Sequence, residues 1–203
     1  ENKKLPDNLD NEIRKAVKNL ESLSDKSFGG EGTPLLLSVR SGGRVSMPGM
    51  MDSVLNIGLN DSNVFQLAEA FNDERFALDS YRRLIQMYSN VVLGVEHERF
   101  EAVLANKKRM DNVVSDADFN VDQLNWIINA YKNTVERFTD SLFPQDPYEQ
   151  LTGAIEAVFN SWQNKRAVIY RKINNIPDSW GTGATIQSCL LYTSDAADEW
   201  RSV

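Results

Sequence analysis

The sequence predicts an α+β protein that is predominantly helical and carries a few strands. Apolar residues recur with helical spacing through most of residues 61–163, whereas two short apolar runs, 35–39 and 184–187, are bounded by turn-forming residues. The 203 residues are 41% hydrophobic and 25% charged, as in ordinary globular proteins. This length suffices for one domain or two small lobes with a core.

A first helix is expected over residues 8–23, because its apolar residues share one face. These residues are Leu9, Ile13, Val17 and Leu20. A Gly-rich stretch, 29–34, ends this region, and the apolar run 35–39 is expected to form a buried strand. Two adjacent glycines and a Pro-Gly pair then predict a loop over residues 40–52.

The middle of the chain is expected to be helical. Its clearest periodicity is carried by Tyr81, Leu84, Ile85, Tyr88, Val91 and Val92. Asn120 with Gln123 is typical of a helix start, with a capping residue followed by its N3 partner. Asp146, Pro147 and Glu149 predict a second start, since they combine a cap, a proline at N1 and an acid at N3.

The C-terminal part is expected to hold a loop and a strand. Residues 177–183 contain a proline and two glycines, and residues 184–187 are suited to a strand. Beyond Ser188 the sequence has no pattern that indicates an element.

Charge and cysteine content exclude several classes of protein. A net charge of −7 argues against general binding to nucleic acid or to anionic membranes. No run of about 18 apolar residues is present, so no membrane-spanning helix is expected. Cys189 is the only cysteine, which excludes an internal disulfide and a multi-cysteine metal site. The polar N-terminus resembles no secretory signal, and we expect a cytoplasmic protein; because the chain begins with Glu1, we also expect a fragment.

The segment after the first predicted strand has the composition of a phosphate site. Glycines let backbone N–H groups approach phosphate oxygens, and Arg40 and Arg44 supply planar donors that match two oxygens at once. The same residues also fit an ordinary turn with a solvated arginine, so composition leaves both interpretations open.

Longer motifs favour the first interpretation. Residues 36–61, LLSVRSGGRVSMPGMMDSVLNIGLND, closely resemble the signature of the nucleotide-binding domain of pyruvate phosphate dikinases. The resemblance continues through 79–88, 143–147, 154–162, 166–171 and 176–187, and spans roughly residues 8 to 188. These motifs are long, ordered and unusual, so a chance match is excluded.

The resemblance implies part of an ATP-grasp fold, in which nucleotide lies between two lobes. Residues 1–60 with 164–188 would form a partial α/β lobe, and 61–163 an inserted helical subdomain. The family converts ATP, pyruvate and phosphate to AMP, phosphoenolpyruvate and pyrophosphate through a phosphohistidine on a swivelling domain. Arginines and Mg²⁺ serve this chemistry by neutralising phosphate charge.

Four residues are expected to bind the nucleotide because they match family positions. Arg40 matches the arginine that contacts the ATP phosphates. Gly49 and Ser53 match the following loop, where the family usually has threonine at position 53. Gln187 matches a residue near the adenine, although an ordinary strand glutamine fits equally well. The resemblance gives Arg44 and Asp52 no firm role, and no catalytic or metal-binding residue is expected in this chain.

Other charged residues receive simpler interpretations. His97, the only histidine, lies among charged residues, is expected at the surface and does not match the phosphorylated histidine of the family. Arg82 and Arg83 are expected on a solvated helix face rather than at a ligand.

Several parts of the family pattern are expected outside this sequence. They are the Gly-rich segment with its phosphate-binding lysine before Glu1, the second lobe with the acidic Mg²⁺ ligands after Gln187, and the phosphohistidine and pyruvate domains. Residues 189–203 depart from the family and look like translated sequencing adapter, so their origin as protein is doubtful. We therefore expect the fragment to be inactive alone.

In the full-length enzyme, the expected partners are ATP, phosphate and the phosphohistidine domain, within a homodimer. Two alternatives stay open. The chain is also compatible with a water-using dikinase such as phosphoenolpyruvate synthase, although the loop of that enzyme typically differs over residues 46–51. From another class, the fragment is compatible with a non-catalytic helical module that binds a protein partner.

Overall fold

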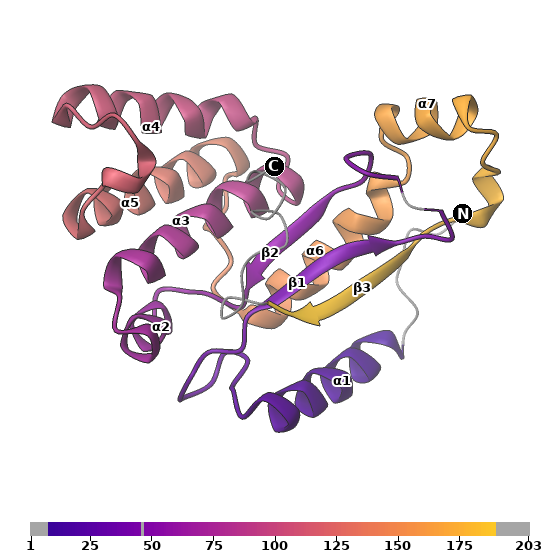
Figure 1. Ribbon diagram of the computed structural model, residues 1–203, viewed down its shortest axis with the longest axis horizontal. Coiled ribbons are helices and arrows are strands. Elements are labelled where there is room, and N and C mark those ends of the chain that lie inside the picture. Colours follow the sequence, from indigo (N-terminus) through magenta and orange to yellow (C-terminus); the bar gives the residue numbers. More distant parts are fainter. Residues whose placement is uncertain (1–7, 46, 190–203) are drawn as a thin grey trace, which may run out of the picture.

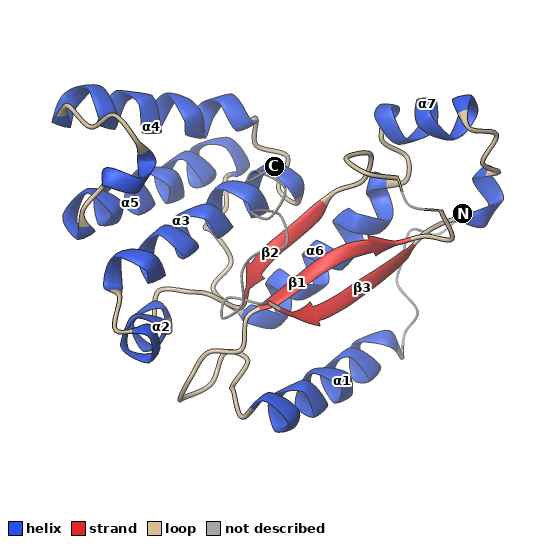
Figure 2. Ribbon diagram, in the orientation of Figure 1, coloured by secondary structure: helices blue, strands red, loops and turns tan. Residues whose placement is uncertain are grey.

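The computed structural model describes residues 8–45 and 47–189, in which a three-stranded sheet is packed against helices (Figures 1 and 2). The helices are α1 (Leu9–Ser24), α2 (Val64–Phe71), α3 (Glu74–Val91), α4 (His97–Asp111), α5 (Val121–Thr139), α6 (Pro147–Ser161) and α7 (Lys165–Ile173). The strands are β1 (Leu37–Gly42), β2 (Ser53–Ile57) and β3 (Gly183–Ser188), and two 3₁₀ turns are η1 (Asp116–Asp118) and η2 (Asp178–Trp180). The predicted α+β class, mostly helical with a small sheet, is confirmed.

The sheet brings together strands from the two ends of the described chain. Its order is β2-β1-β3, and β1 is antiparallel to both neighbours. Side chains alternate along β1, so Leu37 and Val39, both fully buried, point to one face, and Arg40 points to the other. The sheet therefore has one apolar face and one face that carries polar side chains.

Helix α6 covers the apolar face and runs behind the three strands in Figure 1. Its start is the predicted one: Asp146 accepts a hydrogen bond from the N–H of Tyr148 at 2.8 Å, and Pro147 occupies the first turn. The buried apolar residues of α6 are Leu151, Ala154, Ile155 and Val158. From the sequence, α6 was expected in the helical subdomain at 61–163; that division stays a proposal, and the structure shows α6 packed on the sheet.

Helices α2 to α5 form a second packed group, called here the helical part. Asn120 and Gln123 make the predicted capping box at the start of α5, with both hydrogen bonds at 2.9 Å. Edge-to-face aromatic packing joins α4 to α5, where the rings of Phe100 and Tyr131 lie 5.0 Å apart. None of the helices in the described residues is both long and apolar enough to cross a membrane.

One buried glutamine, Gln150, forms hydrogen bonds to both chain segments that connect the sheet to the helical part. The Gln150 side chain accepts from the N–H of Gly58 at 2.9 Å and donates to the carbonyls of Leu59 and Pro144, both at 2.9 Å. The two chain segments that connect the sheet to the helical part are thus bonded to the same side chain. A buried, fully bonded amide of this kind fixes local geometry, because any displacement leaves polar groups unsatisfied.

Some local expectations were wrong. Arg40 was expected in a loop but lies inside β1, which begins at Leu37 and continues through Gly42. Strand β2 was not predicted. Arg82 was expected on a solvated face, yet it is only 3% exposed and pairs with Asp79 at 2.8 Å. Arg83 is exposed as expected, and the doubtful tail lies outside the described residues except for Cys189.

Candidate phosphate-binding site

The polar face of the sheet is centred on Arg40. In the β1 register, Arg40 pairs with Ser53 on β2 and with Thr185 on β3. Directly paired residues of adjacent strands project to the same side of a sheet, so the guanidinium lies in a row between two hydroxyl groups. All three residues are exposed, on the side away from α6. Charged and hydroxyl donors in one row are suited to bind the oxygens of a phosphate group.

Arg40 has no partner of its own. It makes no ion pair, side-chain hydrogen bond or ring contact in the part of the chain that the structure describes. Every other arginine in these residues has such a contact: Arg14, Arg44, Arg75, Arg82, Arg83, Arg99, Arg109, Arg137, Arg166 and Arg171. The donors of Arg40 are therefore available to a ligand without breaking an existing contact.

Two glycines lie next to this row, two residues further along β1 and two residues earlier on β3. Gly42 and Gly183 are paired across β1 and β3. A Cβ at Gly42 would lie 2.7 Å from the hydroxyl oxygen of Thr185, and a Cβ at Gly183 would lie 3.0 Å from the Gly42 carbonyl. The glycines therefore let β1 and β3 approach closely beside Arg40, where any side chain would clash.

Gly49 lies in the loop of residues 43–52, which joins β1 to β2. The loop leaves and re-enters the sheet at the end where Arg40 pairs with Ser53, so it projects beyond the same end. Gly49 has φ of 70° in a turn closed by the N–H of Met50 and the carbonyl of Met47 at 3.1 Å. An added Cβ there would meet nothing within 4 Å, so its backbone is open to a ligand.

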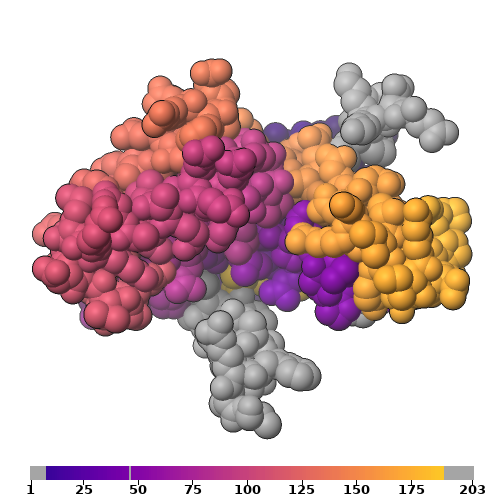
Figure 3. Space-filling view, turned by 90° about the horizontal axis from the view of Figure 1, so that it is seen from above, coloured from indigo at the N-terminus to yellow at the C-terminus, as the bar shows by residue number. Residues whose placement is uncertain are grey.

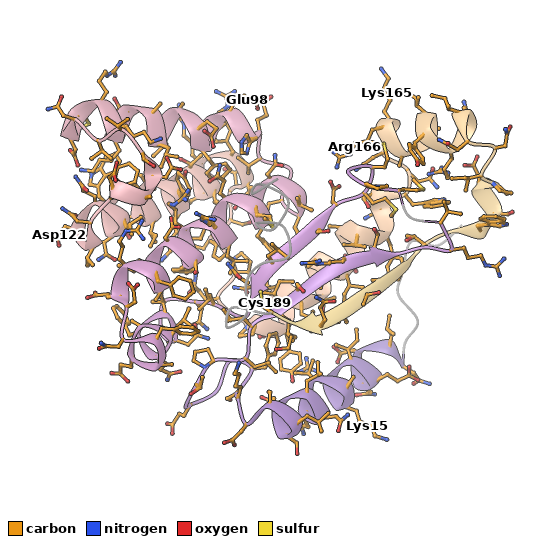
Figure 4. All side chains as sticks on the ribbon, viewed as in Figure 1. Lys15, Glu98, Asp122, Lys165, Arg166 and Cys189 are labelled. Atoms are coloured by element: carbon orange, nitrogen blue, oxygen red, sulfur yellow. The ribbon has the colours of Figure 1, made fainter. Side chains whose placement is uncertain are left out.

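The loop is held from the side by the start of α7. Asn164 donates to one carboxylate oxygen of Asp52 at 2.8 Å, and Arg166 pairs with the other. Arg166 also donates from Nε to the carbonyl of Met50 at 3.1 Å. Figure 4 places Arg166 on the first turn of α7, beside this loop. Sequence reasoning gave Asp52 no role and did not single out Arg166, although both lie in matching motifs.

A second contact joins the loop to the residues after α7. The guanidinium of Arg44 lies 5.7 Å from the ring centroid of Trp180. The space-filling view shows the surface of the β1–β2 region directly against that of the C-terminal segment (Figure 3). The polar face and its loop are therefore framed by segments that are far apart in the sequence.

Gln187 lies on the same face as Arg40 but in a neighbouring position. It pairs with Ser38, two residues before Arg40 on β1. Ser38 is 1% exposed, and its hydroxyl oxygen has no hydrogen-bond partner among the residues that the structure describes. Three of the four predicted residues, Arg40, Ser53 and Gln187, thus share one face of the sheet, and Gly49 lies in the loop at its end. Ser38 and Thr185 were not predicted, because only the strand register identifies them.

A hollow of about 460 Å³ lies on the opposite side of the sheet and is a poorer phosphate site. It is lined by Arg14, Tyr88, Asp146, Tyr148, Glu149, Thr152, Gly153 and Glu156. Three of these residues are carboxylates, and Arg14 is already paired with Asp10 at 2.8 Å. Within residues 8–45 and 47–189, no cluster of three or more His, Cys, Asp or Glu side chains is suited to hold a metal ion.

Comparison with known proteins gives consistent matches. The family described as "Pyruvate phosphate dikinase, AMP/ATP-binding domain" matches residues 1–194. Proteins named pyruvate, phosphate dikinase are 46% identical over 187 residues in Rhizobium meliloti (strain 1021), 48% over 187 in Rickettsia bellii (strain RML369-C) and 45% over 190 in Clostridium symbiosum. These alignments cover 92%, 92% and 93% of this chain, but only 21%, 21% and 22% of the relatives. The chain thus spans about a fifth of their length.

Proposed function

Because the chain belongs to the family of pyruvate phosphate dikinase AMP/ATP-binding domains, we propose that it binds the phosphates of ATP on the polar sheet face, with Arg40 as their anchor. The observation that carries this proposal is the unpaired guanidinium of Arg40, set in a row with Ser53 and Thr185. An exposed arginine with free donors binds phosphate oxygens through two parallel hydrogen bonds.

The residues around Arg40 fit the size and charge of a phosphate group. Hydroxyls on both sides of the guanidinium supply neutral donors, and the glycines at positions 42 and 183 place no side chain beside it. Gly49 exposes backbone at the end of the face, and unbonded backbone N–H groups in a loop are suited to bind an anion. In this arrangement Arg40 neutralises charge and fixes orientation, while the loop contributes uncharged donors.

Gln187 is proposed to contact the part of the nucleotide beyond the phosphates. It lies on the same face as Arg40. It pairs with Ser38 and is two residues after Thr185, which pairs with Arg40. Its amide has both a donor and an acceptor, which suits the edge of a base such as adenine. Gln187 would therefore contribute to nucleotide selectivity more than to phosphate affinity.

The larger enzyme is proposed to be a cytoplasmic, homodimeric pyruvate phosphate dikinase with an ATP-grasp fold. It would convert ATP, pyruvate and phosphate to AMP, phosphoenolpyruvate and pyrophosphate, through a phosphohistidine on a domain outside this sequence. Mg²⁺ would neutralise phosphate charge when bound, with its acidic ligands in the second lobe. On this proposal the chain positions nucleotide and is inactive alone. The relatives' names favour this over a phosphoenolpyruvate synthase.

The test is a calorimetric titration of the chain with ATP and Mg²⁺. Arg40→Ala should lower the affinity by about tenfold or more, because it removes charge-assisted hydrogen bonds. Arg40→Lys should restore part of the affinity, since the charge remains without the planar fork. Arg83→Ala is the matched control, because Arg83 is another exposed arginine, on α3 in the helical part.

Two outcomes would contradict the proposal. Equal affinity of the Arg40→Ala variant would show that the phosphates bind elsewhere. No binding by the folded chain would show that this face is insufficient without the second lobe. If the chain instead captures a protein partner without ATP, and Arg40 is dispensable for that capture, the alternative of a non-catalytic helical module is favoured.

A further inference from the structure

We propose that Arg166 is a positioning residue for residues 47–52, the end of the nucleotide-binding loop, acting through Asp52 and the carbonyl of Met50; this inference rests on the proposed function. Arg166 is not placed in contact with nucleotide. Its role is to hold the loop that bears Gly49 at a fixed position over the end of the polar face.

Arg166 contacts the loop at two separate points. Its Nε donates to the carbonyl of Met50 at 3.1 Å, and its terminal nitrogen pairs with one oxygen of the Asp52 carboxylate. The second oxygen of that carboxylate accepts from Asn164 at 2.8 Å. Both oxygens of Asp52 are thus bound by neighbouring residues at the start of α7, which fixes the position and rotation of the side chain.

Asn164 adds a further contact between the start of α7 and the loop. It occupies the N-cap position of α7, but its side chain makes no capping bond and donates to Asp52 instead. The start of α7 therefore holds Asp52 through two side chains, so Arg166 and Asn164 together limit the movement of this carboxylate.

In the described loop residues, 43–45 and 47–52, the contact of Arg44 with Trp180 lies near the start of the loop, so Arg166 and Asn164 set the geometry of its end. Gly49 has no neighbouring atom within 4 Å of the place where a Cβ would stand, and the flanking turn is closed by one backbone hydrogen bond. Asp52 directly precedes Ser53, which pairs with Arg40. Fixing Asp52 therefore fixes the end of the loop next to the guanidinium. Small errors in the position of a binding loop cost affinity.

The exposure of the Arg166–Asp52 pair indicates that it affects the position of the loop more than the global stability of the fold. The side chain of Arg166 is 51% exposed and that of Asp52 is 21% exposed. A pair that is this open to solvent contributes little to global stability, because water screens it. Loss of the pair should therefore release the loop and leave the rest of the chain folded.

The decisive experiment measures amide hydrogen exchange in the 203-residue chain without nucleotide. Arg166→Gln should make residues 47–52 exchange about tenfold faster, while α6 and the helical part exchange as before. Asp52→Asn is a second variant that breaks the same pair from the other side. The double variant should be no worse than either single one, because the two residues act as a unit. Arg166→Lys should rescue in part.

ATP titration of the same variants completes the test. The affinity should fall about threefold to tenfold in Arg166→Gln, in step with the loss of protection. The matched control is Arg14→Gln, which breaks the exposed Arg14–Asp10 pair on α1 and should change neither readout. Unchanged exchange in both Arg166→Gln and Asp52→Asn overturns the inference, and so does faster exchange with unchanged affinity. No ATP binding by the unmodified chain instead overturns the proposed function.

Discussion

The same residue type serves different purposes in the helical part and on the polar face of the sheet. Arg82 on α3 is 3% exposed and pairs with Asp79 at 2.8 Å, whereas Arg40 on β1 is exposed and has no partner in the described residues. In the helical part, buried charged residues such as Arg82 and Asp79 pair with each other and stabilise the fold. The polar face leaves donors unpaired, as expected where a protein binds a charged ligand at some cost to stability.

The largest effect is expected in the aromatic core of the helical part. Phe100→Ala should lower the free energy of unfolding by about 4 kcal/mol, because it leaves a cavity against Tyr131. Phe65→Ala on α2 is the control, since its side chain is 55% exposed and should change stability little. Urea denaturation measures both. A similar loss in the two variants would show that the helical part is not the stable core that its burial indicates.

The two arginines allow a direct test of the comparison. Arg82→Met should lower the free energy of unfolding by about 3 kcal/mol, because Asp79 loses its buried partner. Arg40→Met should leave the free energy of unfolding almost unchanged and lower the ATP affinity by about tenfold or more. Urea denaturation gives the free energy of unfolding of each variant, and calorimetry gives the ATP affinity of each. A stability loss in Arg40→Met equal to that in Arg82→Met would remove the distinction between the two regions.

A smaller effect is expected from pH, and it arises in the helical part. Burial raises the pKa of Tyr131 to about 12, although Arg82 nearby opposes the shift. Burial also raises the pKa of Tyr81 and of Tyr88 on α3. An unfolded tyrosine ionises near pH 10, so the stability from Tyr131 is fully present below pH 10 and is lost as the pH rises from about 10 to 12.

Tyr131→Phe isolates this contribution. It should reduce the slope of unfolding free energy against pH in that window, by at most about 1.4 kcal/mol per pH unit. Urea denaturation at several pH values measures the slope, and spectroscopic titration of tyrosine follows ionisation directly. An identical slope in the variant would mean that Tyr131 ionises at its ordinary pH in the folded chain.

The smallest effect concerns two buried serines, one in each region. Among the residues that the structure describes, the hydroxyls of Ser38 on β1 and Ser89 on α3 both lack a hydrogen-bond partner. Replacing either by alanine should raise the free energy of unfolding by about 1 kcal/mol, because an unsatisfied buried group is removed. Neither variant should change the ATP affinity, because both side chains are buried and out of reach of a ligand. Urea denaturation measures the stability, and a loss of stability in either variant would show that its hydroxyl is bonded in the folded chain.

Local signals in the sequence predicted local structure well. The capping residues Asn120 and Asp146 were identified from their own neighbours, and the structure confirms both. Such signals work because a cap bonds to N–H groups only two or three residues away. The prediction that His97 lies at the surface is also confirmed, since its side chain is 55% exposed.

Non-local pairing was beyond the reach of these signals. Arg40 was assigned to a loop because glycines follow it, and its pairing with Ser53 and with Thr185 makes the segment a strand. Ser53 was recognised by its motif, but β2 was not, because its five residues lack a clear alternation. Arg82 was assigned to the solvent because the sequence does not show that Asp79 pairs with it in a buried site. Arg166 was missed for the same reason, since its partner Asp52 is distant in the chain.

The strand register also has a consequence for how the chain folds. The helical part is built mainly from contacts between neighbouring helices, which form early because little loop entropy is lost. The β1–β3 pair joins the two ends of the described chain, so it closes the longest loop and is expected to form late. During synthesis, the row of Arg40 and Thr185 cannot assemble until β3 has left the ribosome. A nascent chain would therefore acquire a stable helical part before it acquires any affinity for nucleotide.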